Sequence, residues 1–129
     1  MDSGASYRQN LGRQGEDIAC RLLESEGHRI LERNWRSSHL EIDIISLNAD
    51  GIHFVEVKTR RKSIQGAPQD NVNTAKQRRT ARAAQAFLRC EKGRMFRNME
   101  CFFDVAAITF AGDEAKADLI AHAYIPIYL

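Results

Sequence analysis

The sequence has no apolar run that approaches the roughly 18 residues needed for a membrane-spanning helix. Residues 1–10 contain no apolar segment of the kind found in signal peptides. The three cysteines, Cys20, Cys90 and Cys101, form no Cys-x-x-Cys pair, which argues against a zinc site, and three thiols cannot all pair within one chain. We therefore expect a cytoplasmic protein with reduced cysteines and no membrane association.

Several common catalytic patterns are missing as well. There is no glycine-rich phosphate loop, no Ser-His or Cys-His pattern, and no metal-ligand spacing among the four histidines. A net charge of +2 is too small to indicate a nucleic-acid partner by itself. The charges are unevenly distributed, however, because basic residues cluster in 58–62 and 76–82 while acidic residues gather in 113–118. Carboxylates and basic side chains are therefore the candidates for a functional site.

A chain of 129 residues suits one domain with a single core. Hydrophobic periodicity predicts helices over 8–26 and from residue 73 or 74 to residue 90. Alternating or apolar segments predict strands over 28–36, 40–47, 52–59, 101–110 and 119–127. A loop is expected over 60–71 and a polar turn over 111–116. We therefore predict an α/β protein of order α-β-β-β-α-β-β, with a central mixed sheet flanked by helices, a single domain over 8–129 and a flexible N-terminus over 1–7.

Two carboxylates and a lysine fall on strands that a predicted hairpin turn at residues 48–51 would pair. A regular hairpin places Asp43 opposite Glu56, and strand alternation places Lys58 on the same face as Glu56. Facing carboxylates destabilise a fold unless something compensates their charge, and Mg²⁺ does so because it prefers hard oxygen ligands. Lys58 would then orient or deprotonate a metal-bound water, or stabilise charge on a phosphate. The alternative is a surface strand with cross-strand salt bridges, such as Asp43 to Lys58.

A third carboxylate, Glu16, borders the apolar face of the first predicted helix, where a lone charge is unfavourable. Gly12 and Gly15 leave room beside it for close packing or for a metal. The alternative is a glutamate at the flank of the helix whose carboxylate extends to water.

The second predicted helix carries basic residues near its N-terminus. Lys76 lies in the first turn on the apolar side, where it suits a phosphate or a carboxylate of the sheet. Arg78 and Arg82 form a separate stripe suited to a phosphate backbone, and Arg60 belongs to the basic cluster of the preceding strand. These four residues are the predicted nucleic-acid-binding set. The alternative is a solvated helix face, which we favour for Arg89.

Six short segments together resemble the bacterial YraN-like family, in order over residues 11–108. They are GRQGEDIA at 12–19, RNWR at 33–36, EIDII at 41–45, FVEVKTR at 54–60, KQRR at 76–79 and FDV at 103–105. That family is similar to archaeal Holliday junction resolvases and to the restriction-endonuclease-like superfamily of PD-(D/E)xK nucleases. The resemblance implies a restriction-endonuclease-like fold and a catalytic set of Glu16, Asp43, Glu56 and Lys58. It also implies that this site binds Mg²⁺ or Mn²⁺. In a nuclease, we expect Asp43, Glu56 and the Val57 carbonyl to hold the metal and Glu16 to complete or water-bridge its shell.

The chain departs from that family at two places. Leu40 stands where the family usually has glycine before Glu-Ile-Asp, which would narrow the approach to Asp43. Phe102 stands where the family often has arginine, which would remove a phosphate or structural contact. For the neighbouring Asp104 we expect a structural partner such as an arginine, and for Trp35 we expect packing at the sheet edge rather than stacking on a base.

Three functions remain open at this point. The first is a metal-dependent nuclease acting on DNA, including branched or damaged DNA. The second is a catalytically weak nucleic-acid-binding accessory module in DNA processing, and the third is a structural or protein-interaction domain whose carboxylates only form salt bridges. An intact four-residue site argues against the third. Junction resolvases work as homodimers because they cut two strands symmetrically, and the same arrangement would suit this chain.

Overall fold

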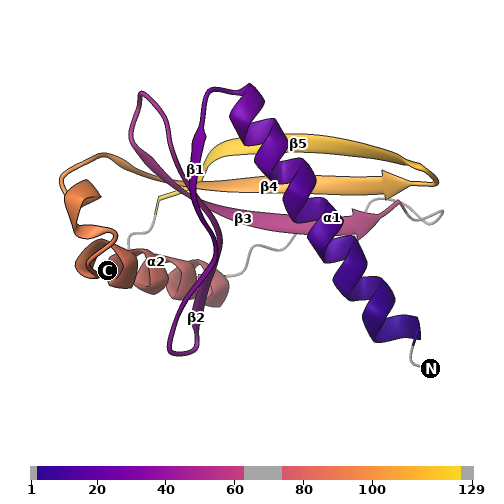
Figure 1. The fold of residues 1–129 in the computed structure, drawn as a ribbon, viewed down its shortest axis with the longest axis horizontal. Helices are drawn as coiled ribbons and strands as arrows, with labels where there is room; N and C mark the ends of the chain where they lie inside the picture. Colours follow the sequence, from indigo (N-terminus) through magenta and orange to yellow (C-terminus); the bar gives the residue numbers. More distant parts are fainter. Residues whose placement is uncertain (1–2, 63–73, 126–129) are drawn as a thin grey trace.

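A computed structural model describes residues 3–62 and 74–125. Within these residues, five strands form one sheet in the order β1-β2-β3-β4-β5, flanked by two α-helices (Figure 1). The elements are α1 (Ser3–Ser25), β1 (Arg29–Ser37), β2 (Leu40–Leu47), β3 (Ile52–Arg61), α2 (Thr74–Arg89), the 3-10 helix η1 (Arg94–Phe96), β4 (Cys101–Ala111) and β5 (Glu114–Tyr124). The predicted α/β class and the predicted order of helices and strands are confirmed.

Two elements begin earlier than predicted. α1 begins at Ser3, so residues 3–7, expected to be flexible, are helical, and no proline interrupts them. β5 begins at Glu114 rather than at residue 119, because the reversal after β4 takes only two residues. Gly112 makes this short turn with a left-handed φ of +61°, which glycine adopts without strain. Most of the loop predicted over 60–71 lies outside the described residues, although β3 continues to Arg61.

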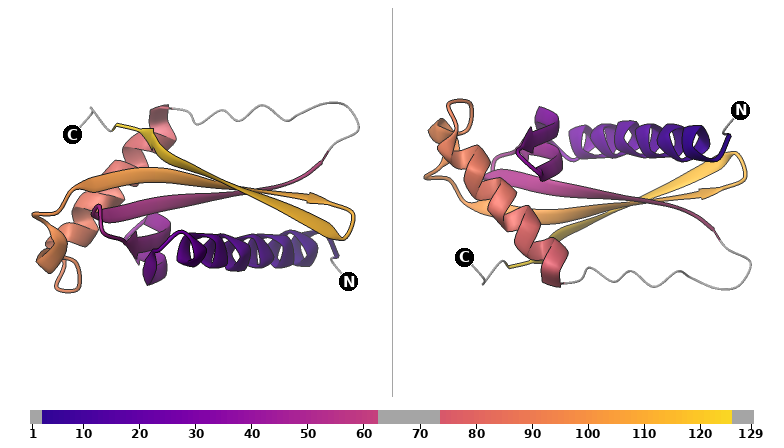
Figure 2. Two further views of the ribbon diagram at one scale, coloured as in Figure 1. Left: turned by 90° about the horizontal axis from the view of Figure 1, so that it is seen from above. Right: turned by 90° about the horizontal axis from the view of Figure 1, so that it is seen from below.

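The sheet is mixed because β3 pairs with β4 in parallel, while the other three described pairings are antiparallel. The crossover between the parallel strands contains α2. α1 and α2 lie on opposite faces of the sheet (Figure 2). The core under α1 includes Leu23, Ile44 and Val55. The core under α2 includes Ile45, Phe54 and Phe87, and Trp35 packs edge-on against Phe87 at 5.3 Å between ring centroids, as predicted for that tryptophan.

The side of the sheet on which the apolar residues of β2 pack changes at Asp43. Ile44 packs in the core under α1, whereas Ile42, two residues earlier, packs in the core under α2. Residues two apart in a regular strand share a face, so the strand is twisted between them. Regular strand alternation, which would place Ile42 and Ile44 on one face, therefore fails at this point of β2. The hairpin of β1 and β2 runs steeply across the direction of β3 (Figure 1), and Asp43 lies where the change occurs.

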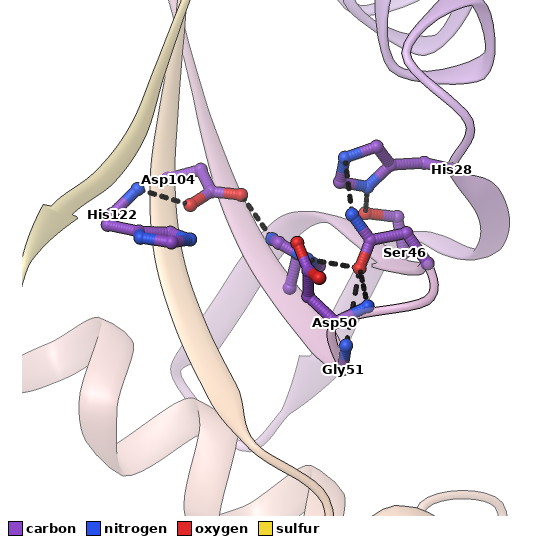
Figure 3. A network of polar contacts seen from close by, with 8 residues as sticks. His28, Ser46, Asp50, Gly51, Asp104 and His122 are labelled. Atoms are coloured by element: carbon purple, nitrogen blue, oxygen red, sulfur yellow. Dashed lines mark hydrogen bonds and ion pairs between the residues drawn. The ribbon is translucent and has the colours of Figure 1, made fainter.

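Asp104 on β4 is buried in a polar network near the start of β3 (Figure 3). Its Oδ2 lies 2.6 Å from Nδ1 of the buried His53, and its Oδ1 accepts a 2.8 Å hydrogen bond from the main-chain N–H of His122. Asp104 therefore has the structural partner expected for it, although that partner is a histidine and not an arginine. His122 has a left-handed φ of 52° in the irregular pairing of β4 with β5, so the carboxylate stabilises a bulge. Phe102, at the position of the family's arginine, stacks on the His122 ring at 4.3 Å.

The same network fastens the turn between β2 and β3. The Asn48 Oδ1 atom lies 2.8 Å from His53 Nε2 and accepts hydrogen bonds from the main-chain N–H groups of Asp50 and Gly51. His28 Nδ1 lies 2.8 Å from the buried Ser46 Oγ. Burial, and then the neighbouring His53, lower the pKa of His28. These contacts give His28 and His53 a structural role and hold the hairpin that carries Asp43.

No helix in the described part of the chain is long and apolar enough to span a membrane. The thiols of Cys20, Cys90 and Cys101 are free, as predicted, and Cys20 on α1 is buried in the core that this helix covers.

Candidate active site

The predicted pairing of β2 with β3 is confirmed up to the residues that carry the site. The hairpin has the expected register, and the last pair of its ladder is Ile44 with Val55. Asp43 and Glu56 would follow as the next pair, but the ladder ends before them. Asp43 Oδ2 instead accepts a 2.8 Å hydrogen bond from the main-chain N–H of Val57. The carboxylates of Asp43 and Glu56 therefore lie where β2 and β3 separate.

Glu56 is a buried carboxylate, with only 5% of the residue exposed. Among the described residues, neither of its carboxylate oxygens has a hydrogen-bond partner, although the Lys76 ammonium on α2 forms an ion pair with Oε1. A buried carboxylate without hydrogen-bond donors destabilises the fold unless a positive charge compensates it. The site of Glu56 therefore favours a cation, and Lys76 supplies part of that charge.

An open cavity of about 240 Å³ joins these residues. Asp43, Glu56 and Glu41 contribute the acidic part of its wall, and Lys76 and Arg79 on α2 contribute the basic part. Leu40 also lines it, so this side chain lies at the cavity that Asp43 borders. Arg79 was not among the predicted site residues. Its position three residues after Lys76 places it on the same helix face, so helical spacing could have identified it.

A second cavity, of about 280 Å³, contains the predicted third carboxylate. Glu16 lines it together with Asp43, Val57 and Gly12. Asp43 thus borders both cavities, Glu56 borders the first and Glu16 the second. Within residues 3–62 and 74–125, no three Asp, Glu, His or Cys side chains lie close enough together to hold a metal ion as a group. The three predicted carboxylates are therefore brought to one region, but not into one shell of ligands.

Glu16 is held by two side chains of β1. The Asn34 Nδ2 group donates a 3.0 Å hydrogen bond to Glu16 Oε1, and the Arg33 Nη2 atom lies 3.7 Å from the same oxygen. Arg33 also forms a 2.8 Å ion pair with Asp17. The Glu16 side chain is 19% exposed, so most of it is covered rather than extended into water. Neither Asn34 nor Arg33 was a predicted site residue, because their proximity to Glu16 depends on how α1 packs on β1.

Close packing of α1 on β3 explains one of the two glycines beside Glu16. A Cβ atom at position 15 would lie 2.1 Å from Thr59 Oγ1, far closer than non-bonded atoms approach. A Cβ atom at Gly12 would meet nothing within 4 Å. Gly15 therefore permits the approach of the helix, as anticipated, while Gly12 leaves open space in the wall of the second cavity.

Asp43 has a perturbed carboxyl group. Burial is the largest cause of its raised pKa, about 6, and the negative charges of Glu16, Glu41 and Glu56 add to the effect. The hydrogen bond from Val57 opposes it. Burial and neighbouring carboxylates make the ionisation of Asp43 unfavourable. A bound cation would stabilise the ionised form of this group.

Lys58 lies apart from the two cavities. It is half-buried on β3 beside Ala107 of β4 and lines neither cavity. In the described part of the chain it forms no salt bridge, so the alternative of an Asp43–Lys58 pair is not realised there. Arg78 and Arg82 are exposed on α2, and Arg60 is half-buried near the end of β3. These three residues also lie outside both cavity walls.

The sequence matches a known protein family. Residues 15–108 match the family described as "Uncharacterised protein family UPF0102". The chain belongs to this family. A UPF0102 protein of Syntrophotalea carbinolica is 43% identical over 117 residues, which cover 91% of this chain and 93% of the relative. Another, from Chlorobium chlorochromatii, is 47% identical over 98 residues, which cover 76% of this chain and 73% of the relative. The resemblance to the YraN-like family is thereby confirmed.

The matched range of UPF0102 contains all four predicted catalytic residues, from Glu16 to Lys58, and the α2 residues Lys76 and Arg79. A third relative, the UPF0102 protein CPE1705 of Clostridium perfringens (strain 13 / Type A), is 40% identical over 113 residues, covering 88% of this chain and 90% of the relative. The names of these relatives state no activity.

Proposed function

We propose that this chain is a metal-dependent phosphodiesterase that acts on DNA and has a restriction-endonuclease-like fold. The observation that carries the proposal is the cavity in which Asp43 and the buried carboxylate of Glu56 face Lys76 and Arg79. Acidic groups suited to a divalent cation and basic groups suited to a phosphate thus share one opening. A salt-bridged surface strand would have exposed carboxylates instead.

The residues present fit Mg²⁺ or Mn²⁺. Mg²⁺ usually takes one or two carboxylates and completes its shell with water and substrate phosphate oxygens, so the cation does not require three protein carboxylates in one place. Asp43 and Glu56 would provide the side-chain ligands, with the Val57 carbonyl and Glu16 as the further proposed contributors. When bound, such an ion activates a water molecule and offsets negative charge on the phosphate.

The remaining residues of the site would act on the substrate. Lys76 and Arg79 place two positive charges on the α2 side of the cavity, where they would hold the phosphate. Arg78, Arg82 and Arg60 lie outside the cavity, so they would contact more distant phosphates. Lys58 shares a strand face with Glu56 by alternation, and we assign it to the attacking water or to the charge that develops on the phosphate.

A second candidate function is a catalytically weak accessory module that binds nucleic acid. Two observations favour it: Lys58 lines neither cavity, and the ammonium of Lys76 already pairs with Glu56. In such a module the basic residues would bind phosphates while the carboxylates would not support turnover.

One assay separates the two. The purified chain is incubated with labelled linear, single-stranded, flapped and four-way DNA, each with Mg²⁺, with Mn²⁺ and with a chelator. Metal-dependent cleavage of any substrate that is lost in Asp43→Asn supports the phosphodiesterase. Binding without cleavage on the whole panel supports the accessory module, and neither binding nor cleavage contradicts both.

A further inference from the structure

Asn34 has an unusual backbone for a residue in a strand. Its φ is +52°, in the left-handed region that residues other than glycine seldom occupy and that asparagine tolerates best. It lies in β1 between the pairs Arg33–Ile44 and Trp35–Ile42, so it faces Asp43 across the ladder. This is also where β2 passes from one core to the other, because Ile44 and Ile42 pack on opposite sides of the sheet. A strained conformation opposite a candidate functional residue motivates a functional hypothesis.

The Asn34 side chain indicates what that function is. Its amide Nδ2 donates a 3.0 Å hydrogen bond to Glu16 Oε1, and the Arg33 guanidinium approaches the same oxygen at 3.7 Å. Both contacts use Oε1, and no described residue donates a hydrogen bond to Oε2. Glu16 and Asp43 line one cavity. Asn34 therefore fixes one oxygen of Glu16 and leaves the other available beside Asp43.

We infer that Asn34 is a positioning residue, which holds Glu16 as a cation ligand beside Asp43. The left-handed backbone at Asn34 lies beside the twist of β2 at which the ladder with β3 ends before Asp43. The same segment of β1 therefore arranges the carboxylates of both Glu16 and Asp43. Without Asn34, the Glu16 side chain would keep only the longer contact with Arg33, which is shared with Asp17. Hydrogen-bond partners of metal ligands commonly change metal affinity by about tenfold or more when they are removed. The inference depends on the proposed metal-dependent function.

The test measures Mn²⁺ affinity by titration calorimetry in wild type, Asn34→Gly, Glu16→Ala and the double variant. Glycine keeps the left-handed backbone without strain and removes the side chain with its amide. We expect Asn34→Gly to weaken Mn²⁺ binding by about tenfold, Glu16→Ala to weaken it at least as much, and the double variant to match Glu16→Ala. Asn98→Gly, at an exposed asparagine beyond η1, is the matched control and should bind as wild type does.

Each outcome decides something different. An Asn34→Gly protein that binds Mn²⁺ as wild type does overturns the inference and leaves the proposed function intact. The inference is also overturned if Asn34→Gly weakens Mn²⁺ binding as much in the Glu16→Ala protein as in wild type. Asn34 would then act on something other than Glu16. A wild-type protein that binds no Mn²⁺ contradicts the proposed function itself and the inference with it. Melting temperatures of the metal-free proteins identify any variant whose loss of affinity comes from unfolding.

Discussion

The Asp43 carboxylate accepts a 2.8 Å hydrogen bond from the main-chain N–H of Val57. This bond joins β2 to β3 immediately beyond the last pair of their ladder, Ile44 with Val55. It occupies Oδ2 and leaves Oδ1 as the Asp43 oxygen available to a cation. It also ties the position of Asp43 to the strand that carries Glu56, so the two carboxylates of the proposed centre keep a fixed relationship.

A divalent cation should raise the melting temperature of the wild-type protein. The cation would bind the folded chain and relieve the repulsion between Asp43 and Glu56, and a concentration of 100 times its dissociation constant stabilises the fold by about 2.7 kcal/mol. Thermal melts with Mn²⁺ and with a chelator measure the effect. Asp43→Asn should show no shift, whereas Asp50→Asn, at an exposed turn residue, should shift as wild type does. Equal shifts in wild type and Asp43→Asn would contradict a metal site at Asp43.

The raised pKa of Asp43 predicts that stability without metal declines with pH. The carboxyl group titrates near 3.8 when unfolded and near 6 when folded, so between these values the folded chain binds more protons than the unfolded chain. Stability from this group is present below pH 4 and is lost as pH rises through 6, by up to about 3 kcal/mol at 1.4 kcal/mol per pKa unit. Denaturant unfolding in the presence of a chelator measures this at pH 4 and pH 7. The free energy of unfolding of Asp43→Asn, relative to that of wild type, should be higher at pH 7 than at pH 4. A constant difference between the two proteins would mean that Asp43 is not perturbed.

Lys58→Met should abolish cleavage while DNA binding stays nearly intact. The substitution keeps the apolar stem and removes the ammonium, which we assign to the transition state rather than to substrate binding. Loss of one such group lowers turnover by about 100-fold or more. Turnover and gel-shift affinity on the best substrate of the panel measure the two effects separately. Cleavage that persists unchanged in both Lys58→Met and Asp43→Asn would come from a contaminant and would favour the accessory module.

Arg79→Gln should weaken DNA binding and make it less sensitive to salt. Each phosphate contact that is lost lowers the slope of log affinity against log salt concentration by about one. Arg79 lines the cavity with Glu56, whereas Arg89, exposed at the end of the same helix, lines neither cavity and provides the control. Fluorescence anisotropy at several salt concentrations gives both slopes. If Arg89→Gln changes the slope as much as Arg79→Gln, the binding surface extends along α2 instead of centring on the cavity.

Gly15→Ala should destabilise the fold, and Gly12→Ala should not. A methyl group at position 15 would collide with Thr59, and such overpacking costs about 1–3 kcal/mol. At position 12 the methyl group meets open space, and the higher helix propensity of alanine should add up to about 1 kcal/mol. Denaturant unfolding of both variants measures the difference. Thr59→Ala should recover part of the stability lost in Gly15→Ala, and no recovery would place the collision elsewhere.

The sequence by itself determined the features that depend on neighbouring residues. Apolar periodicity gave the order of helices and strands, and the Asn48–Gly51 turn gave the register that brings Asp43 to the position next to Glu56. Strand alternation and turn chemistry act over a few residues, so they can be read without knowing what packs on them. The boundaries that failed, at Ser3 and Glu114, lie at element ends, where local signals are weakest.

Only the tertiary structure decided which side chains meet across elements. The position of Arg79 at the cavity depends on how α2 packs on the sheet, and the bond from Asn34 to Glu16 depends on how α1 packs on β1. Likewise, the pairing of Asp104 with His53 joins residues on two strands that a helical crossover separates. The twist that sends Ile42 and Ile44 to different cores breaks the alternation on which the sequence argument relied. These contacts join residues far apart in the chain, and their geometry follows from close packing of the whole core rather than from any local pattern.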